Sequence, residues 1–244
     1  KDMFAGELDL KDWYKPNFDK KFLKELSKRS DLKGIIDVFI YLLALVVSGY
    51  FCFLTWGSWW SLISFFIYGN IFYSKAISIQ HETNHETYFK SRWLNKSFYH
   101  ITSLLGGFEA VRWKWSHFHH HSYTIFTTKE KYDYENNCPR PTEPIRFLIS
   151  FFPFGPLLNI QKIRHFTHFE IVKHAMGIVS PVVKITVPKK EIQMVINSSR
   201  FYVFFWLFVI TLSLYLQSWL PILMIILPPF YGNTILLLMA LTQH

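Results

Sequence analysis

Four apolar runs, joined in pairs by very short turns, constrain the fold of this chain more than any other feature. The first pair covers about residues 35–55 and 61–79, and the second covers about residues 201–216 and 220–241. A helix rising roughly 1.5 Å per residue needs about 20 apolar residues to cross a hydrocarbon core of roughly 30 Å. The runs therefore predict an all-α integral membrane protein, with four transmembrane helices arranged as two hairpins.

The distribution of positive charge predicts how these helices are oriented. The chain carries a net charge of +9, but its Lys and Arg residues lie in the N-terminal arm, 1–34, and in residues 75–200. The two hairpin turns, 56–60 and 217–219, contain none. By the positive-inside rule, both termini and the segment 81–200 are cytoplasmic. We expect 1–34 to be an amphipathic arm on lipid headgroups, and no nucleic-acid-binding motif is present.

Two local features modify this simple topology. The central segment contains one apolar stretch, Phe147–Ile160, which is interrupted by prolines and a glycine and is short for a span. It is therefore expected to be interfacial or re-entrant. Pro228 and Pro229 fall within the fourth run and predict a kink there.

Histidines form two dense groups next to the predicted cytoplasmic ends of the spans. The sequence HETNH places two histidines four residues apart, and WSHFHHHSYT contains an H-x-x-H-H pattern. Residues three or four apart share a helix face, so each group can direct its imidazoles to one point. A further histidine follows the fourth run at the same membrane depth. The expected metal ligands are His81, His85, His117, His120, His121 and His244.

The number of these ligands favours two metal ions, because six imidazoles exceed the four ligands of a tetrahedral zinc site. Imidazole also suits copper, iron and nickel, so ligand type alone does not identify the metal. His119 falls off the ligand face and is expected to support the ligands or to face solvent. His100 is expected to be structural, and His165, His168 and His174 are not included in the ligand set.

Two other classes of protein fit the histidines less well. H-E-x-x-H is also the zinc-protease signature. A metzincin, however, would have glycine and histidine where Tyr88 and Ser91 stand, and the later apolar runs offer no acidic residue to an intramembrane protease. A membrane zinc metalloprotease is thus a remote alternative. A metal transporter would place ligands within its spans, which here are almost free of polar residues.

Taken together, the two boxes and their position after the second of four spans resemble the membrane-bound fatty acid desaturase family. The resemblance rests on HETNHETYFKSRWLN and WSHFHHHSYT and covers nearly the whole chain, with 35–244 as the desaturase domain. It implies a cytoplasmic helical cap that carries the histidine boxes and holds two iron ions. It also suggests Glu82, Asn84 and Glu86 as partners that orient the imidazoles.

The same resemblance raises expectations about the chain's completeness. Thr242–His244 is similar to the segment that precedes the family's third histidine box, and the box itself is missing. We therefore expect a truncated sequence that is inactive by itself. The family's DPE-like segment after the second box corresponds to Tyr132–Glu135, with Tyr134 in place of proline.

The implied activity is O2-dependent desaturation of a lipid acyl chain, in a tunnel lined by aromatic residues such as Trp113 and Trp115. No electron-transfer motif is fused to the chain, so a separate ferredoxin or cytochrome b5-type donor is expected to supply two electrons. The alternative on the same site is a hydroxylase or monooxygenase of hydrocarbon or lipid-like substrates. The histidines do not separate the two reactions.

Overall fold

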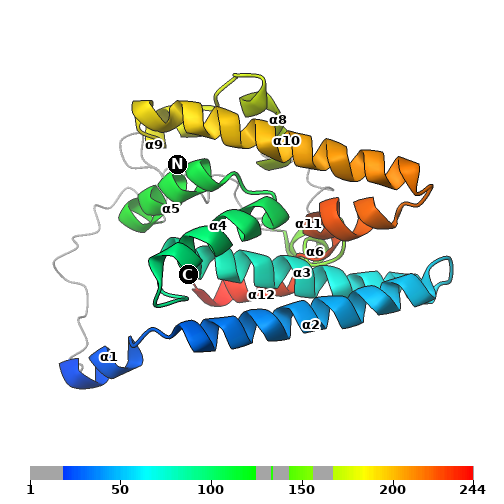
Figure 1. Ribbon diagram of the computed structural model, residues 1–244, viewed down its shortest axis with the longest axis horizontal. Helices are drawn as coiled ribbons and strands as arrows, with labels where there is room; N and C mark the ends of the chain where they lie inside the picture. The colour runs from blue at the N-terminus through cyan, green and yellow to red at the C-terminus, as the bar shows by residue number, and fades with distance from the viewer. Residues whose placement is uncertain (1–18, 125–132, 134–142, 156–166, 244) are drawn as a thin grey trace.

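The computed structural model describes residues 19–124, 133, 143–155 and 167–243, and these residues form helices and connecting turns without a strand (Figure 1). The helices are α1 Lys20–Leu26, α2 Asp31–Thr55, α3 Trp60–Asn84, α4 Arg92–Gly106, α5 Ala110–Tyr123, α6 Pro144–Ile149, α8 Thr167–Ala175, α9 Pro181–Thr186, α10 Ile192–Tyr215, α11 Pro228–Tyr231 and α12 Thr234–Gln243. Two short turns complete the set, η3 Lys189–Glu191 and the π-helical η4 Ile222–Ile226. The prediction of an all-helical protein is confirmed.

Three helices of the described chain are long and apolar enough to cross a membrane. They are Asp31–Thr55, Trp60–Asn84 and Lys189–Tyr215, the last formed by η3 and α10 together. Figure 1 shows α2 and α3 as a long hairpin, with α12 alongside α3, α10 on the other side of the molecule and α4 between the hairpin and α10. Gly57 closes the hairpin turn with φ +81°, a conformation that glycine adopts without strain.

The second apolar run is part of a longer helix than its hydropathy indicates. The run ends near residue 79, whereas α3 continues to Asn84. The extra turn is polar but buried: the Gln80 side chain donates to Ser103 Oγ of α4 (2.9 Å), and the Thr83 hydroxyl donates to the Ile79 carbonyl (2.6 Å). Because α4 covers this turn, the helix persists beyond its apolar part and carries the first histidine box.

The fourth apolar run is broken into η4, α11 and α12, and the described part of it contains no helix long enough to be a candidate span. Pro228 and Pro229 begin α11, since proline fits the first turn of a helix. Side chains of α3 satisfy the backbone groups freed by the breaks. The Tyr68 hydroxyl donates to the Met224 carbonyl (3.0 Å), and Asn70 Oδ1 accepts from the Ile235 N–H (2.9 Å). Buried helices tolerate such interruptions when a neighbour supplies these bonds.

The apolar stretch in the central segment packs against these same broken helices. The Phe154 N–H donates to the Phe230 carbonyl (2.9 Å), and the Thr234 hydroxyl donates to the Phe151 carbonyl. Residues 156–160 of the stretch lie outside the described chain. The described part of this stretch therefore consists of α6 and a tight turn, and the turn packs against α11 and α12.

Two acidic residues of α2 connect this helix to the chain that follows the first histidine box. The Asp31 carboxylate accepts hydrogen bonds from the backbone and hydroxyl of Ser91 (2.8 and 2.6 Å), where α4 begins. The Asp37 carboxylate contacts Lys75 Nζ of α3 at 2.5 Å and accepts from the Tyr88 hydroxyl. These contacts fix the end of α3 and the connecting segment 85–91 relative to α2.

The N-terminal arm is described only from residue 19. The Asp19 side chain caps α1 by accepting from the Lys21 N–H (2.8 Å). Phe22, Leu23 and Leu26 of α1 are exposed. The proposed contact of this arm with lipid headgroups remains a prediction, and Phe18 lies outside the described residues.

Candidate metal centre

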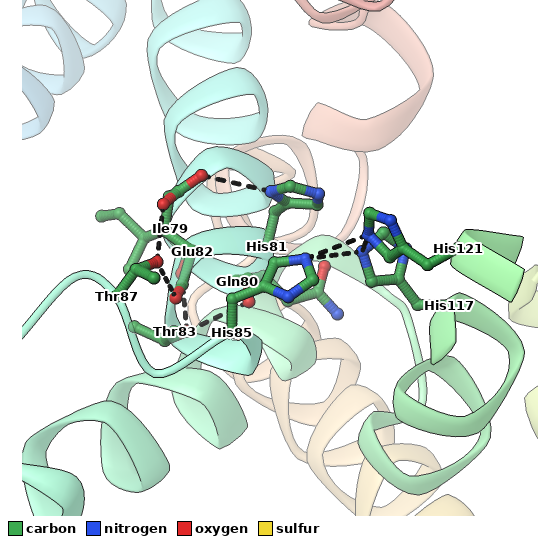
Figure 2. A network of polar contacts seen from close by, with 9 residues as sticks. All are labelled: Ile79, Gln80, His81, Glu82, Thr83, His85, Thr87, His117 and His121. Carbon is green, nitrogen blue, oxygen red and sulfur yellow. Dashed lines mark hydrogen bonds and ion pairs between the residues drawn. The ribbon is translucent and has the colours of Figure 1, made fainter. Parts of the chain in front are cut away.

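Four imidazoles from two helices converge on one point at the end of α3 (Figure 2). His81 lies in the last turn of α3 and His85 caps this helix, while His117 and His121 lie one turn apart on α5. One ring nitrogen from each of the four lies within 4.8 Å of the others. Figure 2 shows the rings of His85, His117 and His121 directed toward one another, with His81 beside them. The grouping of the two sequence-distant boxes is therefore present in the fold.

The nitrogen atoms are spaced as the ligands of a single ion would be. The Nε2 atoms of His85, His117 and His121 are 3.0, 3.0 and 3.2 Å apart. An ion with metal–nitrogen bonds of about 2.1 Å places its ligand nitrogens about 3.0 Å apart at right angles and about 3.4 Å apart in a tetrahedron. A hydrogen bond between two imidazoles needs one donor nitrogen and one acceptor nitrogen. Among three Nε2 atoms at least two have the same role, so hydrogen bonds cannot join all three pairs and do not by themselves favour the arrangement. The geometry and the donor set both fit a transition metal.

The local fold of α5 orients its two ligands. Both oxygens of the Glu109 carboxylate accept backbone N–H groups of the first turn, from Val111 (3.0 Å) and Arg112 (2.7 Å), which fixes where the helix begins. Burial raises the pKa of this carboxyl. Trp113 then stacks on His117, with ring centroids 4.3 Å apart and planes inclined by 10°. The stacked indole therefore fixes the plane of the His117 imidazole.

Glu82, one of the residues proposed to orient the imidazoles, contacts the first box. Its carboxylate lies 3.3 Å from Nδ1 of His81 and accepts a hydrogen bond from the Thr87 hydroxyl (2.7 Å). Figure 2 shows this chain of contacts on the side of His81 that faces away from the other imidazoles. A carboxylate at Nδ1 stabilises the tautomer whose Nε2 lone pair is available to a metal.

His120 has a different environment from the four convergent histidines. Its Nδ1 lies 2.9 Å from each carboxylate oxygen of Asp133, and both side chains are 3% exposed. The ring lies next to the cluster, with its centroid 5.7 Å from that of His121. Sequence reasoning assigned Asp133 only to the Tyr132–Glu135 segment and missed its contact with His120. The acidic residue following the second box was the available signal.

The remaining predicted site residues are not part of the four-histidine group. Glu86 adopts φ +56° and its carboxylate lies 3.6 Å from Arg92 Nε. Asn84 borders a cavity beside the cluster, and the ring of His119 packs on Tyr123. His244 lies outside the described residues.

Histidines not predicted to be ligands also lie away from the centre. The ring of His168 stacks on Trp206, and His174 Nε2 accepts from the Ser180 N–H (3.2 Å). His100 lines the cavity that Asn84 borders. His165 lies outside the described residues.

The electrostatics of the cluster favour neutral imidazole, the form that binds metals. Burial, with smaller contributions from the three neighbouring imidazoles, lowers the pKa of His85 from 6.5 to about 4, because the imidazoles repel a second positive charge. At neutral pH His85 is therefore uncharged, and one of its two ring nitrogens carries a lone pair. This is the protonation state that a cation in the centre requires.

A family model described as "Fatty acid desaturase" matches residues 57–244, which includes both histidine boxes and the whole four-histidine cluster. Searches of curated proteins and of solved structures give no significant match.

Proposed function

Because the chain belongs to the fatty acid desaturase family, we propose that it is a membrane-bound, O2-dependent di-iron desaturase that introduces a double bond into a lipid acyl chain. The observation that carries this proposal is the convergence of His81, His85, His117 and His121 at the end of the apolar helix α3. A site that activates dioxygen beside lipid needs metal ligands at this position.

Six histidines would hold the two iron ions. The four convergent imidazoles form the described part of the site. His120, oriented by Asp133, and His244 would complete it together with further ligands. Iron bound there would supply the oxidising power that removal of hydrogen from an unactivated methylene requires. Glu82 and Asp133 would keep Nδ1 of His81 and His120 protonated, so that each Nε2 faces the centre.

The overall reaction defines what the site must exchange with its surroundings. Two hydrogens leave the acyl chain, two electrons and two protons arrive from outside, and one dioxygen becomes two waters. Residues 1–244 contain no haem-binding or iron–sulfur motif. A separate ferredoxin or cytochrome b5-type protein would therefore deliver the electrons. The basic cytoplasmic residues would favour an acidic donor.

We further propose that the polypeptide crosses the membrane four times, with both termini and the histidine boxes on the cytoplasmic side. The first three crossings are α2, α3 and α10, and the broken segment from η4 to α12 would be the fourth. The absence of Lys and Arg from the two hairpin turns supports this orientation.

A hydroxylase or monooxygenase remains the alternative on the same centre, because the outcome depends on how the substrate C–H bonds lie relative to the iron. The zinc-protease alternative has little support. Its catalytic glutamate would be Glu82, whose carboxylate instead contacts His81 and Thr87. Family membership also argues against hydrolysis of peptides.

The test is iron content and product mass for the full-length protein in membranes with an electron donor. We expect about two irons per chain and an acyl product lighter by two hydrogens. His117→Ala with His121→Ala should lose the iron, whereas His119→Ala, on the same helix but outside the cluster, should keep it. A product heavier by one oxygen would favour the hydroxylase, and one zinc per chain with no oxidised product would refute both.

A further inference from the structure

Two adjoining cavities form one groove along the α2–α3 hairpin. The first has a volume of about 560 Å³ and is lined by both helices, from Trp60 beside the hairpin turn to Ile71. The second, of about 360 Å³, lies nearer the histidine end of α3, and its lining also includes Ile235 and Met239 of α12, which Figure 1 shows alongside α3. Ala44 and Ile71 line both cavities, so the two are continuous.

The part of the groove near the hairpin turn is apolar. Its hydroxyl side chains are already bonded within the protein: Ser48 donates to a carbonyl one turn earlier (2.6 Å), and the hydroxyls of Thr55 and Ser64 bond to each other (2.9 Å). The side chains of Phe51 and Ile63 line it and are exposed. Because α2 and α3 are long and apolar enough to cross a membrane, this open part of the groove suits a hydrocarbon chain.

The part of the groove near the histidine end contains hydrogen-bond donors that lack acceptors. Asp37, Ser74 and Lys75 all line it. The Lys75 ammonium has three N–H groups, and in the described part of the chain its one acceptor is Asp37, at 2.5 Å. Ser74 is 5% exposed, and its Oγ has no hydrogen-bond partner among the described residues. A ligand that brings acceptor oxygens to this place would therefore remove the cost of unbonded donors.

The length of the groove matches one lipid molecule. Lys75 and Ile63 are twelve residues apart on α3, which corresponds to ~18 Å along the helix. One leaflet is about half of a hydrocarbon core of roughly 30 Å, so a single acyl chain covers most of this distance. Acceptor oxygens at Lys75 and hydrocarbon beyond it reproduce the order of groups in a membrane lipid.

A further positive charge lies at the mouth of the groove. Lys33 is one turn before Asp37 on α2 and therefore on the same helix face, and it is exposed. Within the described residues Lys33 forms no ion pair, whereas Asp37 and Lys75 compensate each other. The mouth thus carries a net positive charge at the end where the lipid headgroup would lie. This charge complements a negative headgroup.

From these features we propose that the groove binds one anionic phospholipid as a resident lipid of the α2–α3 hairpin. The phosphate contacts Lys33, the ester oxygens accept from Lys75 and Ser74, and one acyl chain lies between the helices toward Trp60. No histidine of the metal centre lines either cavity, so this lipid is separate from the chain that the protein is proposed to oxidise.

The experiment is native mass spectrometry of the purified full-length protein, released from detergent micelles that contain a stated lipid. Dioleoyl phosphatidylglycerol is the anionic probe, dioleoyl phosphatidylcholine the zwitterionic one, and oleate tests for a bare carboxylate. We expect one phosphatidylglycerol per chain, bound roughly fivefold more tightly than phosphatidylcholine. Ala44→Phe places a ring where the two cavities join and should abolish this binding. Val46→Phe is the matched control, because Val46 lies on the same helix with 69% exposure and outside the lining.

Two milder variants test the polar end even if Ala44→Phe does not fold. Lys33→Gln and Ser74→Ala should each weaken binding roughly fivefold, through loss of one charge and of one hydrogen bond respectively. Lys24→Gln removes the same charge from α1 and should change binding less than twofold.

The proposal is overturned if phosphatidylcholine or oleate binds as tightly as phosphatidylglycerol, or if Lys33→Gln and Ser74→Ala both bind like the unmodified protein. A folded Ala44→Phe that retains the lipid would also overturn it. So would a protein dimer that forms without lipid and is lost in Ala44→Phe, because the groove would then belong to a second copy of the chain. Binding needs neither iron nor an electron donor, so the result is independent of the proposed reaction.

Discussion

Both carboxylate oxygens of Asp133 lie 2.9 Å from Nδ1 of His120, and the two side chains are almost fully buried together. A buried carboxylate at one imidazole nitrogen determines which nitrogen carries the proton. It therefore directs the Nε2 lone pair of His120 to the opposite side. This contact also connects α5 to residue 133, beyond the described end of the helix.

We predict that Asp133→Leu weakens iron retention by roughly tenfold to a hundredfold, the usual effect of removing a carboxylate that orients a metal-bound histidine. Asp133→Asn keeps an acceptor oxygen for Nδ1–H and should have a smaller effect. Iron release to a competing chelator measures both. Equal retention in Asp133→Leu and the unmodified protein would show that the carboxylate has no role in metal binding.

Helical spacing predicted that the histidines of each box share a helix face, but it did not predict the contact between His120 and Asp133. The spacing of four between His81 and His85, and between His117 and His121, was enough to place each pair on one face. That the two faces meet followed from their common membrane depth. The partner of His120 could not be obtained in this way, because Asp133 lies thirteen positions further along the chain, beyond the helix whose period places the histidines.

The same limit applies to the fold. Hydropathy predicted α2, α3 and most of α10, since a helix in lipid must be apolar over its whole length. It also predicted one kinked helix over residues 220–241, whereas the structure has three short pieces. The breaks depend on Tyr68 and Asn70 of α3, which bind the freed backbone groups. Counting apolar residues along the sequence does not detect polar contacts between residues that are far apart in the chain.

The broken segment also depends on a close approach of two glycines. A Cβ atom placed on Gly232 would lie 2.0 Å from the backbone oxygen of Gly69, and one on Gly69 would overlap the Tyr231 ring. We predict that Gly232→Ala forces α11 away from α3 and destabilises the protein by roughly 1–3 kcal/mol. Gly177→Ala is a control with open space at its Cβ but a strained backbone. Denaturant unfolding in bicelles compares the two, and an effect at Gly232 no larger than at Gly177 would contradict the packing argument.

The ion pair between Asp37 and Lys75 allows a test of charge compensation at the apolar helices. Asp37→Leu leaves the ammonium of Lys75 without its 2.5 Å partner and should cost about 2–3 kcal/mol in a bilayer. Asp37→Leu with Lys75→Met removes both charges and should recover most of that loss. Tyr88→Phe controls for the hydroxyl that also donates to Asp37. A double variant no more stable than Asp37→Leu would show that the pair is not coupled.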